Sequence, residues 1–178
     1  MISCEGLQAV CGVRADRIVT IYPFLCAALE TYHADTPLRI AMFVAQAAHE
    51  TAGFRYLEEI ASGEAYEGRR DLGNTQRGDG KRYKGRGVFQ LTGRANYARC
   101  SKALFENESV LLDAPWLLAD PEAAATSAGW YWDWKQLNIP ADAKNVLAVT
   151  KKINGGTNGL AERQRLYGRA LYVLGVRS

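Results

Sequence analysis

The sequence predicts a mainly α-helical protein with one helix buried at its centre, and three patterns support this. Apolar residues recur at three- and four-residue spacings between Arg14 and Tyr32, as on one face of an amphipathic helix. The stretch that begins at Thr36-Pro37 is apolar on nearly all sides, which is typical of a buried helix. Further helical patterns follow over residues 92–104, 121–137, 142–153 and 160–174.

The chain length is consistent with one domain. With 178 residues, of which 48% are hydrophobic, the chain can bury a single core. Its five prolines are scattered and no repeat is visible, so we expect one domain over residues 1–178. No apolar run approaches the roughly 20 residues that cross a bilayer, and the N-terminus lacks the features of a secretory signal. We therefore expect no stable membrane insertion and no signal peptide.

The central helix carries the first candidate for chemistry. Its start is marked by a capping threonine and by Pro37 at the first helical position. At its far end, Gln46, His49 and Glu50 share one face, and Gly53 can end the helix. Burial and the negative end of the helix dipole both raise the pKa of such a carboxyl, toward the value of about 6 that suits a general acid. The alternative is a structural glutamate paired with an arginine.

A second carboxylate follows closely. Four glutamates lie within 17 residues of Glu50, at Glu58, Glu59, Glu64 and Glu67. Glycoside hydrolysis uses two carboxyls, which stand about 5–5.5 Å apart in retaining enzymes and roughly 6.5–9.5 Å apart in inverting ones. Sequence spacing does not give this distance, and each of the four taken alone fits a solvated surface residue.

Metal and nucleotide motifs are absent from the sequence. His49-Glu50 would need a second histidine at position 53 for the zinc-protease motif, and Gly53 stands there. The glycine-rich segment 63–87 is typical of a long loop, and we expect a short hairpin within it. Its sequence does not match the motif of a phosphate-binding loop. We therefore expect no metal and no cofactor.

The cysteines and the aromatic cluster are interpreted as core residues. Cys4, Cys11, Cys26 and Cys100 contain no C-x-x-C pair, which favours buried thiols, with a bridge from Cys4 to Cys11 or Cys26 as the alternative. The aromatic residues near the end of the 121–137 segment are able to stack on sugars, but their helical spacing predicts core packing for most of them: Trp130, Tyr131, Trp132 and Trp134.

The positive charge is concentrated in one segment. Residues 69–102 hold ten lysines and arginines against two aspartates, a net charge of +8, whereas the whole chain carries +3. Such a segment indicates a polyanionic partner, which could be a nucleic acid, an anionic membrane or an acidic cell wall. The alternative is a solvated basic face without a partner.

Four separated motifs resemble those of glycoside hydrolase family 19, the chitinase family that also includes many bacteriophage endolysins. In order, they are FVAQAAHET at 43–51, YKGRGVFQLT at 83–92, NY at 96–97 and INGG at 153–156. The resemblance extends to about Leu171. It implies a lysozyme-like, bilobal helical fold with an open substrate cleft, and an inverting mechanism that needs no metal or nucleotide.

The resemblance also assigns roles to residues of this chain. It places the general acid at Glu50. In short bacterial and phage members the general base comes nine residues later, at Glu59, whereas plant members place it further along, so Glu58, Glu64 and Glu67 remain open. Gln90 and Thr92 match residues that bind sugar and hold the attacking water, although threonine here replaces the usual serine.

The remaining matches concern substrate binding. Asn96 and Asn154 match sugar-binding asparagines, and an asparagine amide both donates and accepts hydrogen bonds. Arg163 matches an arginine that tunes the carboxylate network. His49 is expected on the substrate side, as a hydrogen-bonded histidine that orients the region of Glu50.

Chitin and peptidoglycan share an N-acetylated β-1,4 backbone, so the matching residues do not distinguish them. The short chain, the absence of a chitin-binding module and the basic segment favour peptidoglycan and an endolysin-like hydrolase of the muramidase type. We expect a monomer that binds no nucleic acid, accumulates in the host cytoplasm and reaches the wall through a membrane pore or another export route. The alternatives are a chitinase, a lytic transglycosylase that releases 1,6-anhydro products, or a non-catalytic module that binds the wall or a nucleic acid.

Overall fold

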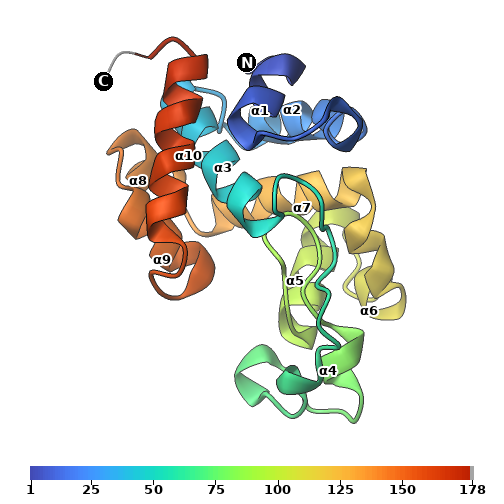
Figure 1. Ribbon diagram of the computed structural model, residues 1–178. Coiled ribbons are helices and arrows are strands. Elements are labelled where there is room, and N and C mark those ends of the chain that lie inside the picture. The colour runs from blue at the N-terminus through green and yellow to red at the C-terminus, as the bar shows by residue number, and fades with distance from the viewer. Residues whose placement is uncertain (177–178) are drawn as a thin grey trace.

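The computed structural model describes residues 1–176 and consists of helices joined by turns (Figure 1). The α-helices are α1 (Cys4–Cys11), α2 (Tyr22–Thr31), α3 (Pro37–Glu50), α4 (Asp79–Arg82), α5 (Arg94–Phe105), α6 (Val110–Asp113), α7 (Pro121–Trp134), α8 (Asn138–Asp142), α9 (Val146–Asn154) and α10 (Leu160–Val173). The only β pairing within the described residues consists of isolated bridges, Glu58 with Arg86 and Arg86 with Leu91. The mainly α prediction is confirmed. No helix in this part of the chain is long and apolar enough to cross a membrane.

Helix α3 is the buried centre of the molecule, as predicted. Every residue from 40 to 48 is buried, and α3 packs along α10 and also touches α1 and α8. Its Phe43 ring lies 5.1 Å from the Phe89 ring and 5.0 Å from the Trp132 ring, measured between centroids. The helix begins where expected, because the Thr36 side chain accepts a hydrogen bond from the Arg39 amide at 3.4 Å.

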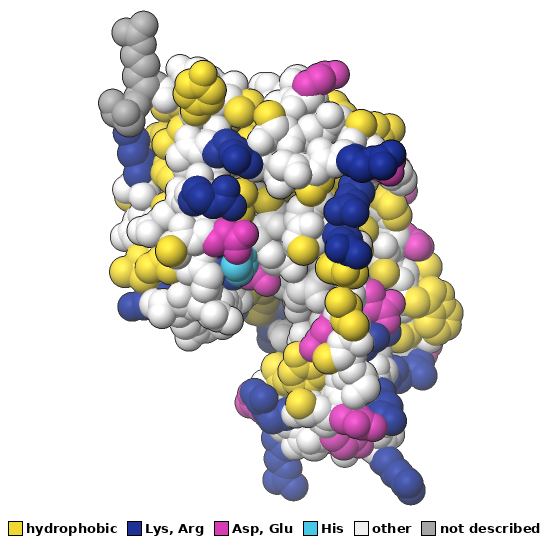
Figure 2. All heavy atoms as spheres, viewed as in Figure 1, with side chains coloured by type: hydrophobic (Ala, Val, Ile, Leu, Met, Phe, Trp, Pro, Cys, Tyr) yellow, Lys and Arg dark blue, Asp and Glu magenta, His cyan; other side chains and the backbone are white. Residues whose placement is uncertain are grey.

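The core is divided into two clusters. The larger one surrounds α3 and includes side chains of α1, α2, α7, α9 and α10. The smaller one lies under α5 and α6 and consists of Tyr83, Leu91, Tyr97, Cys100, Leu111 and Leu118. Tyr131 of α7 packs against both. Figure 2 shows the surface hollowed between the two parts. The bilobal expectation is therefore confirmed.

Two expected helices are shorter than their sequence patterns. The 14–32 segment holds a 3-10 turn at Ala15–Arg17, and α2 starts only at Tyr22. Pro23 lies in the first turn of α2, where its missing N–H costs nothing, whereas it would break a longer helix. The 142–153 segment starts at Val146, because the Asn145 side chain caps α9 by accepting from the Ala148 amide at 2.9 Å.

The glycine-rich segment is a loop without the expected hairpin. It contains two 3-10 turns, at Glu64–Tyr66 and Arg70–Leu72, and then α4. Asp79 is buried and accepts hydrogen bonds from the guanidinium of Arg94, at 2.6 and 2.9 Å, and from the amide of Gln76 at 3.0 Å. Buried polar contacts of this kind, and not strand pairing, hold the loop.

The cysteines and the aromatic residues differ in how far the core interpretation holds. All four cysteines are free thiols, of which Cys100 is buried and the others are half-buried. Among the aromatic residues of α7, Trp132 is fully buried. Trp130 and Tyr131 are half-buried and pack against the core clusters, so the core interpretation holds for most of this group. Trp134 is the exception, because it is half-buried and stacks on Trp130. Helical spacing identified the helix but not the width of its buried face.

The packing of α2 against α7 depends on Gly129. A Cβ at this position would overlap the Tyr32 ring, so we expect Gly129→Ala to destabilise the fold by about 1–3 kcal/mol through overpacking. Gly168→Ala in α10 is the matched control, because a Cβ there meets nothing within 4 Å and alanine favours a helix by about 0.5–1 kcal/mol. Urea denaturation measures both changes. Equal effects of the two substitutions would contradict the close-packing account.

The Asp79–Arg94 pair predicts a pH dependence of stability. Hydrogen bonds from Arg94 hold the pKa of the Asp79 carboxyl below its ordinary value. The pair therefore stabilises the fold fully above the unfolded-state pKa of about 3.9 and loses this effect as the pH falls through the folded-state pKa. We expect Asp79→Asn to lower the free energy of unfolding by about 2 kcal/mol at pH 7. Denaturation between pH 7 and pH 3 should show this difference shrinking below about pH 4, and a constant difference would exclude the pair as its cause.

Candidate active site

Glu50 is the last residue of α3 and is held by an arginine from α10. Its side chain is 18% exposed, and its Oε1 accepts a hydrogen bond from Nη2 of Arg163, whose side chain is 1% exposed. Within residues 1–176 no other donor bonds to this carboxyl, so its second oxygen is left for a ligand. The structural alternative of a glutamate paired with arginine is thus present, and it also fixes the direction of the carboxyl.

Arg163 is itself held by a buried network. Its Nη1 donates to Oε1 of Gln46 at 2.5 Å, and Nε2 of Gln46 donates to the Thr150 hydroxyl at 3.3 Å. Its Nε donates to the carbonyl of Asn158 at 3.3 Å. A buried arginine needs such partners, because an unpaired buried charge is costly. The network joins α3, α9 and α10 behind Glu50.

His49 is anchored to the same turn of α10. Its Nδ1 lies 2.7 Å from the carboxylate of Glu162, and because an ionised carboxylate only accepts, Nδ1 carries the proton. Gly159 lies directly against the ring, with a φ of +70° and no space for a Cβ. The two neighbouring residues His49 and Glu50 are thus both fixed by the start of α10.

Glu59 lies on the segment that pairs with residues 85–87. Its amide donates to the Gly85 carbonyl at 2.9 Å. Its carboxylate accepts from the Tyr66 hydroxyl and from the Gly85 amide, both at 3.0 Å. A Cβ at Gly85 would stand 3.2 Å from Glu59 Oε2 and 3.0 Å from Gln90 Oε1, so glycine lets both side chains approach. Only neutral donors hold this carboxylate.

The other three glutamates make contacts that suit structural roles. Glu58 accepts from Lys84 at 2.9 Å and from Arg86 at 3.3 Å. Burial raises the pKa of Glu58, but these two cations outweigh it and the net shift is downward. Glu64 forms an exposed ion pair with Lys81 at 2.7 Å. The carboxylate of Glu67 accepts from two loop amides, those of residues 78 and 80, at 2.6 and 2.8 Å.

The residues after the GRG motif form a short chain of hydrogen bonds. Gln90 has a φ of +48°, an uncommon conformation for a residue other than glycine. The Thr92 hydroxyl donates to the Gln90 carbonyl at 2.9 Å, and Asn96 Nδ2 donates to the Thr92 carbonyl at 2.8 Å. Because the Thr92 hydroxyl has used its proton, its oxygen is left to accept from a water or a sugar.

Asn154 lies at the opposite side of the site, at the end of α9. It is exposed, and its Nδ2 donates to the Asn158 carbonyl at 3.0 Å. This bond leaves its side-chain oxygen as an acceptor. Asn154 shares the Asn158 carbonyl with Arg163, which ties the asparagine to the network behind Glu50.

Two tyrosines at the site were missed in the sequence. Tyr66 holds Glu59, and burial followed by this bond raises the pKa of Tyr66. Burial and then the charge of Glu50 raise the pKa of Tyr131 to about 12. Tyr66 stands in a loop without a recognisable pattern, so no sequence signal could have found it. Tyr131 follows helical spacing and was therefore assigned to the core.

Half of the cations in the basic segment are paired with carboxylates within the fold. Seven of its ten cations bond to carboxylates or carbonyls: Arg69, Lys81, Arg82, Lys84, Arg86, Arg94 and Lys102. Its net charge therefore overstates how many cations are available to a polyanion. Across residues 1–176, no group of three or more histidines, cysteines and acidic residues is arranged to hold a metal ion.

The comparison with known families assigns the chain. A family model described as chitinase class I matches residues 22–174. The chain belongs to glycoside hydrolase family 19. A family 19 domain-containing protein of Haemophilus influenzae is 30% identical over 86% of this chain and 88% of its own length. An endochitinase of Arabidopsis thaliana is 34% identical over 82% of the chain, which spans only 50% of that plant protein.

Solved structures agree on the fold of this family 19 glycosidase. Chitinase C from Streptomyces griseus superposes with a TM-score of 0.79 at 24% identity, covering 98% of this chain and 92% of that one. The lysozyme-like helical fold expected from the motifs is therefore confirmed.

The buried Arg163–Glu50 pair should dominate local stability. Arg163→Gln removes the cation and leaves Glu50 without its partner, and we expect a loss of about 3–5 kcal/mol in the free energy of unfolding. Arg165→Gln is the control in the same helix, because Arg165 forms only an exposed pair with Glu162 at 3.8 Å, worth under about 0.5 kcal/mol. Chemical denaturation of both variants checks this, and similar losses would show that the pair is not structurally important.

Proposed function

We propose that this family 19 glycosidase hydrolyses the β-1,4 bonds between N-acetylated amino sugars of bacterial peptidoglycan, with inversion at the anomeric carbon. The observation that carries the proposal is the contrast between two carboxylates, Glu50 and Glu59. Glu50 is fixed at the end of a buried helix with one oxygen free. Glu59, nine residues further along the chain, is held by neutral donors and lies with Gln90 against Gly85.

In the proposed reaction, protonated Glu50 gives its proton to the glycosidic oxygen as the bond to the anomeric carbon breaks. Glu59 takes a proton from a water that attacks this carbon from the opposite face. The Thr92 oxygen accepts a hydrogen bond from the same water. The product is a hemiacetal of inverted configuration, and each carboxyl returns to its starting state by exchanging a proton with solvent.

The assignment of Glu59 as general base has electrostatic support. A general base has to be an accessible carboxylate whose lone pairs are not tied up by cations. Glu58 lies between Lys84 and Arg86, and Glu64 is paired with Lys81. Within residues 1–176, the carboxylate of Glu59 contacts only the Tyr66 hydroxyl and the Gly85 amide, which orient it without neutralising it. Glu67 is also held by amides alone, but Glu59 lies with Gln90 against Gly85 of the GRG motif.

The biological role proposed with this substrate is that of an endolysin-like enzyme. It would accumulate in the host cytoplasm and act on the wall after release through a membrane pore or another export route. The second candidate is a chitinase. The Arabidopsis relative, which is named an endochitinase, favours this candidate.

The decisive test measures reducing-end release from purified peptidoglycan and from chitin oligomers. We expect wild type to cut peptidoglycan, and Glu50→Gln and Glu59→Gln each to lower kcat by roughly 10²–10⁴-fold. Glu64→Gln is the control, because Glu64 is exposed and paired with Lys81, and it should retain activity. Mass spectrometry of the products should show ordinary reducing ends, since 1,6-anhydro ends would indicate a lytic transglycosylase.

Other outcomes of the same test reassign the enzyme. Cleavage of chitin oligomers without cleavage of peptidoglycan would make it a chitinase. Full activity of Glu59→Gln together with an inactive Glu58→Gln would move the general base to Glu58. Binding without any hydrolysis would leave only a wall-binding module.

A further inference from the structure

Three cations from three helices gather beside the cleft. Arg99 lies on α5, Lys135 caps the end of α7, and Lys152 lies on α9. The Lys135 ammonium lies 3.8 Å from the centroid of the Trp134 ring, and the Arg99 guanidinium carbon lies 4.7 Å from the same centroid. The Lys152 ammonium donates to the Lys135 carbonyl at 2.9 Å. We call Arg99, Lys135 and Lys152 the cationic cluster.

The cluster has no carboxylate partner. Within residues 1–176, none of its three members forms an ion pair, whereas five of the ten cations of the basic segment do. Burial lowers the pKa of Lys135, and the charges of Arg99 and Lys152 lower it further. Lys135 is half-buried, whereas Arg99 and Lys152 are exposed. Like charges that gather without a counter-ion repel one another, and an anion would relieve this repulsion.

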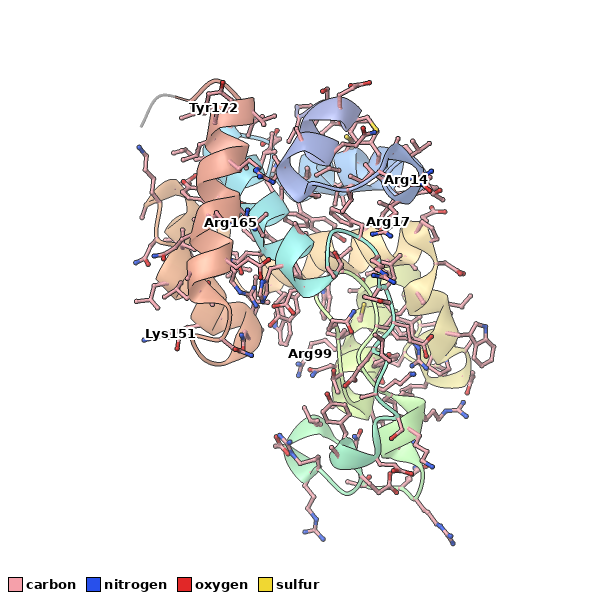
Figure 3. All side chains as sticks on the ribbon, viewed as in Figure 1. Arg14, Arg17, Arg99, Lys151, Arg165 and Tyr172 are labelled. Atoms are coloured by element: carbon pink, nitrogen blue, oxygen red, sulfur yellow. The ribbon has the colours of Figure 1, made fainter. Side chains whose placement is uncertain are left out.

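Tyr131 connects the cluster to the catalytic residues. Its hydroxyl donates to the Lys152 carbonyl at 3.1 Å, and the Lys135 ammonium lies 5.6 Å from its ring centroid. Burial and then the charge of Glu50 raise the pKa of the same tyrosine. Lys152 also precedes the candidate sugar-binding Asn154 by two residues. Figure 3 shows Arg99 reaching from α5 into the opening between the two parts of the molecule.

A surface cavity adjoins the cluster. It has a volume of about 540 Å³ and is lined by Arg99, Trp130, Trp134, Glu108, Lys102 and small residues of α5. The two indole rings are stacked, with centroids 5.2 Å apart and an interplanar angle of 11°. Apolar and aromatic walls with a few charged groups at the edge are typical of sites for organic ligands.

We propose that the cationic cluster is a subsite for a carboxylate carried by the glycan substrate. The inference rests on the proposed function for its ligand, a peptidoglycan strand, whose lactyl groups and stem peptides bear carboxylates. Chitin is uncharged and offers nothing to the cluster. The cluster is thus the feature of the site that distinguishes the two polymers, whereas Glu50 and Glu59 act on the backbone that both share.

The geometry fits a carboxylate. Arg99 has a planar guanidinium that binds a carboxylate through two parallel hydrogen bonds, and the lysines add point charges. Lys135 lies against the Trp134 ring, and Lys152 bonds to the Lys135 carbonyl. Both side chains are therefore partly ordered before a ligand binds, so binding costs less conformational entropy. A sugar ring in the adjoining cavity would bring its substituent to these cations.

The test measures binding, so that it does not depend on hydrolysis. In a Glu50→Gln background, calorimetry compares a peptide-free peptidoglycan tetrasaccharide, the same strand with stem peptides, and chitin tetraose. We expect Arg99→Gln, Lys135→Gln and Lys152→Gln each to weaken binding of a carboxylated strand about tenfold relative to chitin tetraose. Lys151→Gln is the matched control, since Lys151 points away from the opening (Figure 3), and it should change neither affinity.

The ligands separate the two sources of carboxylate. A selective loss with the peptide-free strand assigns the lactyl group, and a selective loss only with the peptide-bearing strand assigns the stem peptide. Lys135→Arg keeps the charge and should retain binding. If this variant also loses binding, the loss seen with Lys135→Gln is due to misfolding and not to the missing charge. Equal weakening toward all three ligands, no weakening, or no measurable binding of either carboxylated strand overturns the subsite.

Failure of this inference differs from failure of the proposed function. Peptidoglycan hydrolysis by wild type, with binding that the cluster variants do not alter, removes the subsite and keeps the function. Cluster-dependent binding of a carboxylated strand that wild type does not cut removes the function and keeps the subsite.

Discussion

The site depends on one buried ion pair, between Arg163 of α10 and Glu50 of α3. These residues are 113 positions apart in sequence, and the pair is formed where the two most closely packed helices of the molecule meet. A charge as deeply buried as that of Arg163 is tolerated only because Glu50, Gln46 and a carbonyl surround it. The same contacts that satisfy the arginine orient the carboxyl, so the stability of the fold and the position of the proposed general acid depend on the same bonds.

The two carboxyls are held in different ways, and this difference suits their proposed roles. Glu50 is positioned by a cation inside the larger core. Glu59 is positioned by a hydroxyl and a backbone amide on the loop side of the cleft. Gly85 makes the second arrangement possible, because any larger residue would crowd Glu59 and Gln90. The proposed acid–base pair therefore consists of one carboxyl at the end of a buried helix and one on a loop that polar contacts hold in place.

The sequence predicted the parts of this structure that depend on local pattern. The all-round apolar character of α3 identified the central helix, and Glu50 stood out as a charge at its end. The predictions of the bilobal fold and of Glu59 rested on the family motifs. No sequence pattern predicted the ion pairs. These are two ion pairs, that of Arg163 with Glu50 and that of Arg94 with Asp79. Whether they form depends on which helices pack together, and local sequence patterns do not show this. The net charge of the basic segment does not give the number of cations available to a ligand, because a charge count does not show that Arg86 and Lys84 share Glu58. The half-buried state of Trp134 was not predicted, because helical spacing locates one face of a helix but does not show which elements pack against it.

The anchoring of the glycine-rich loop has a consequence for proteolysis. The loop and its flanks hold many lysines and arginines, after which trypsin-like proteases cleave, and an unanchored glycine-rich chain would be cut readily. A protease has to draw several residues of extended backbone into its own site. In this loop, Glu67 binds two amides and Asp79 binds Arg94, so cleavage requires local opening first. The rate of nicking in this segment therefore reports how often the loop that holds Glu59 opens.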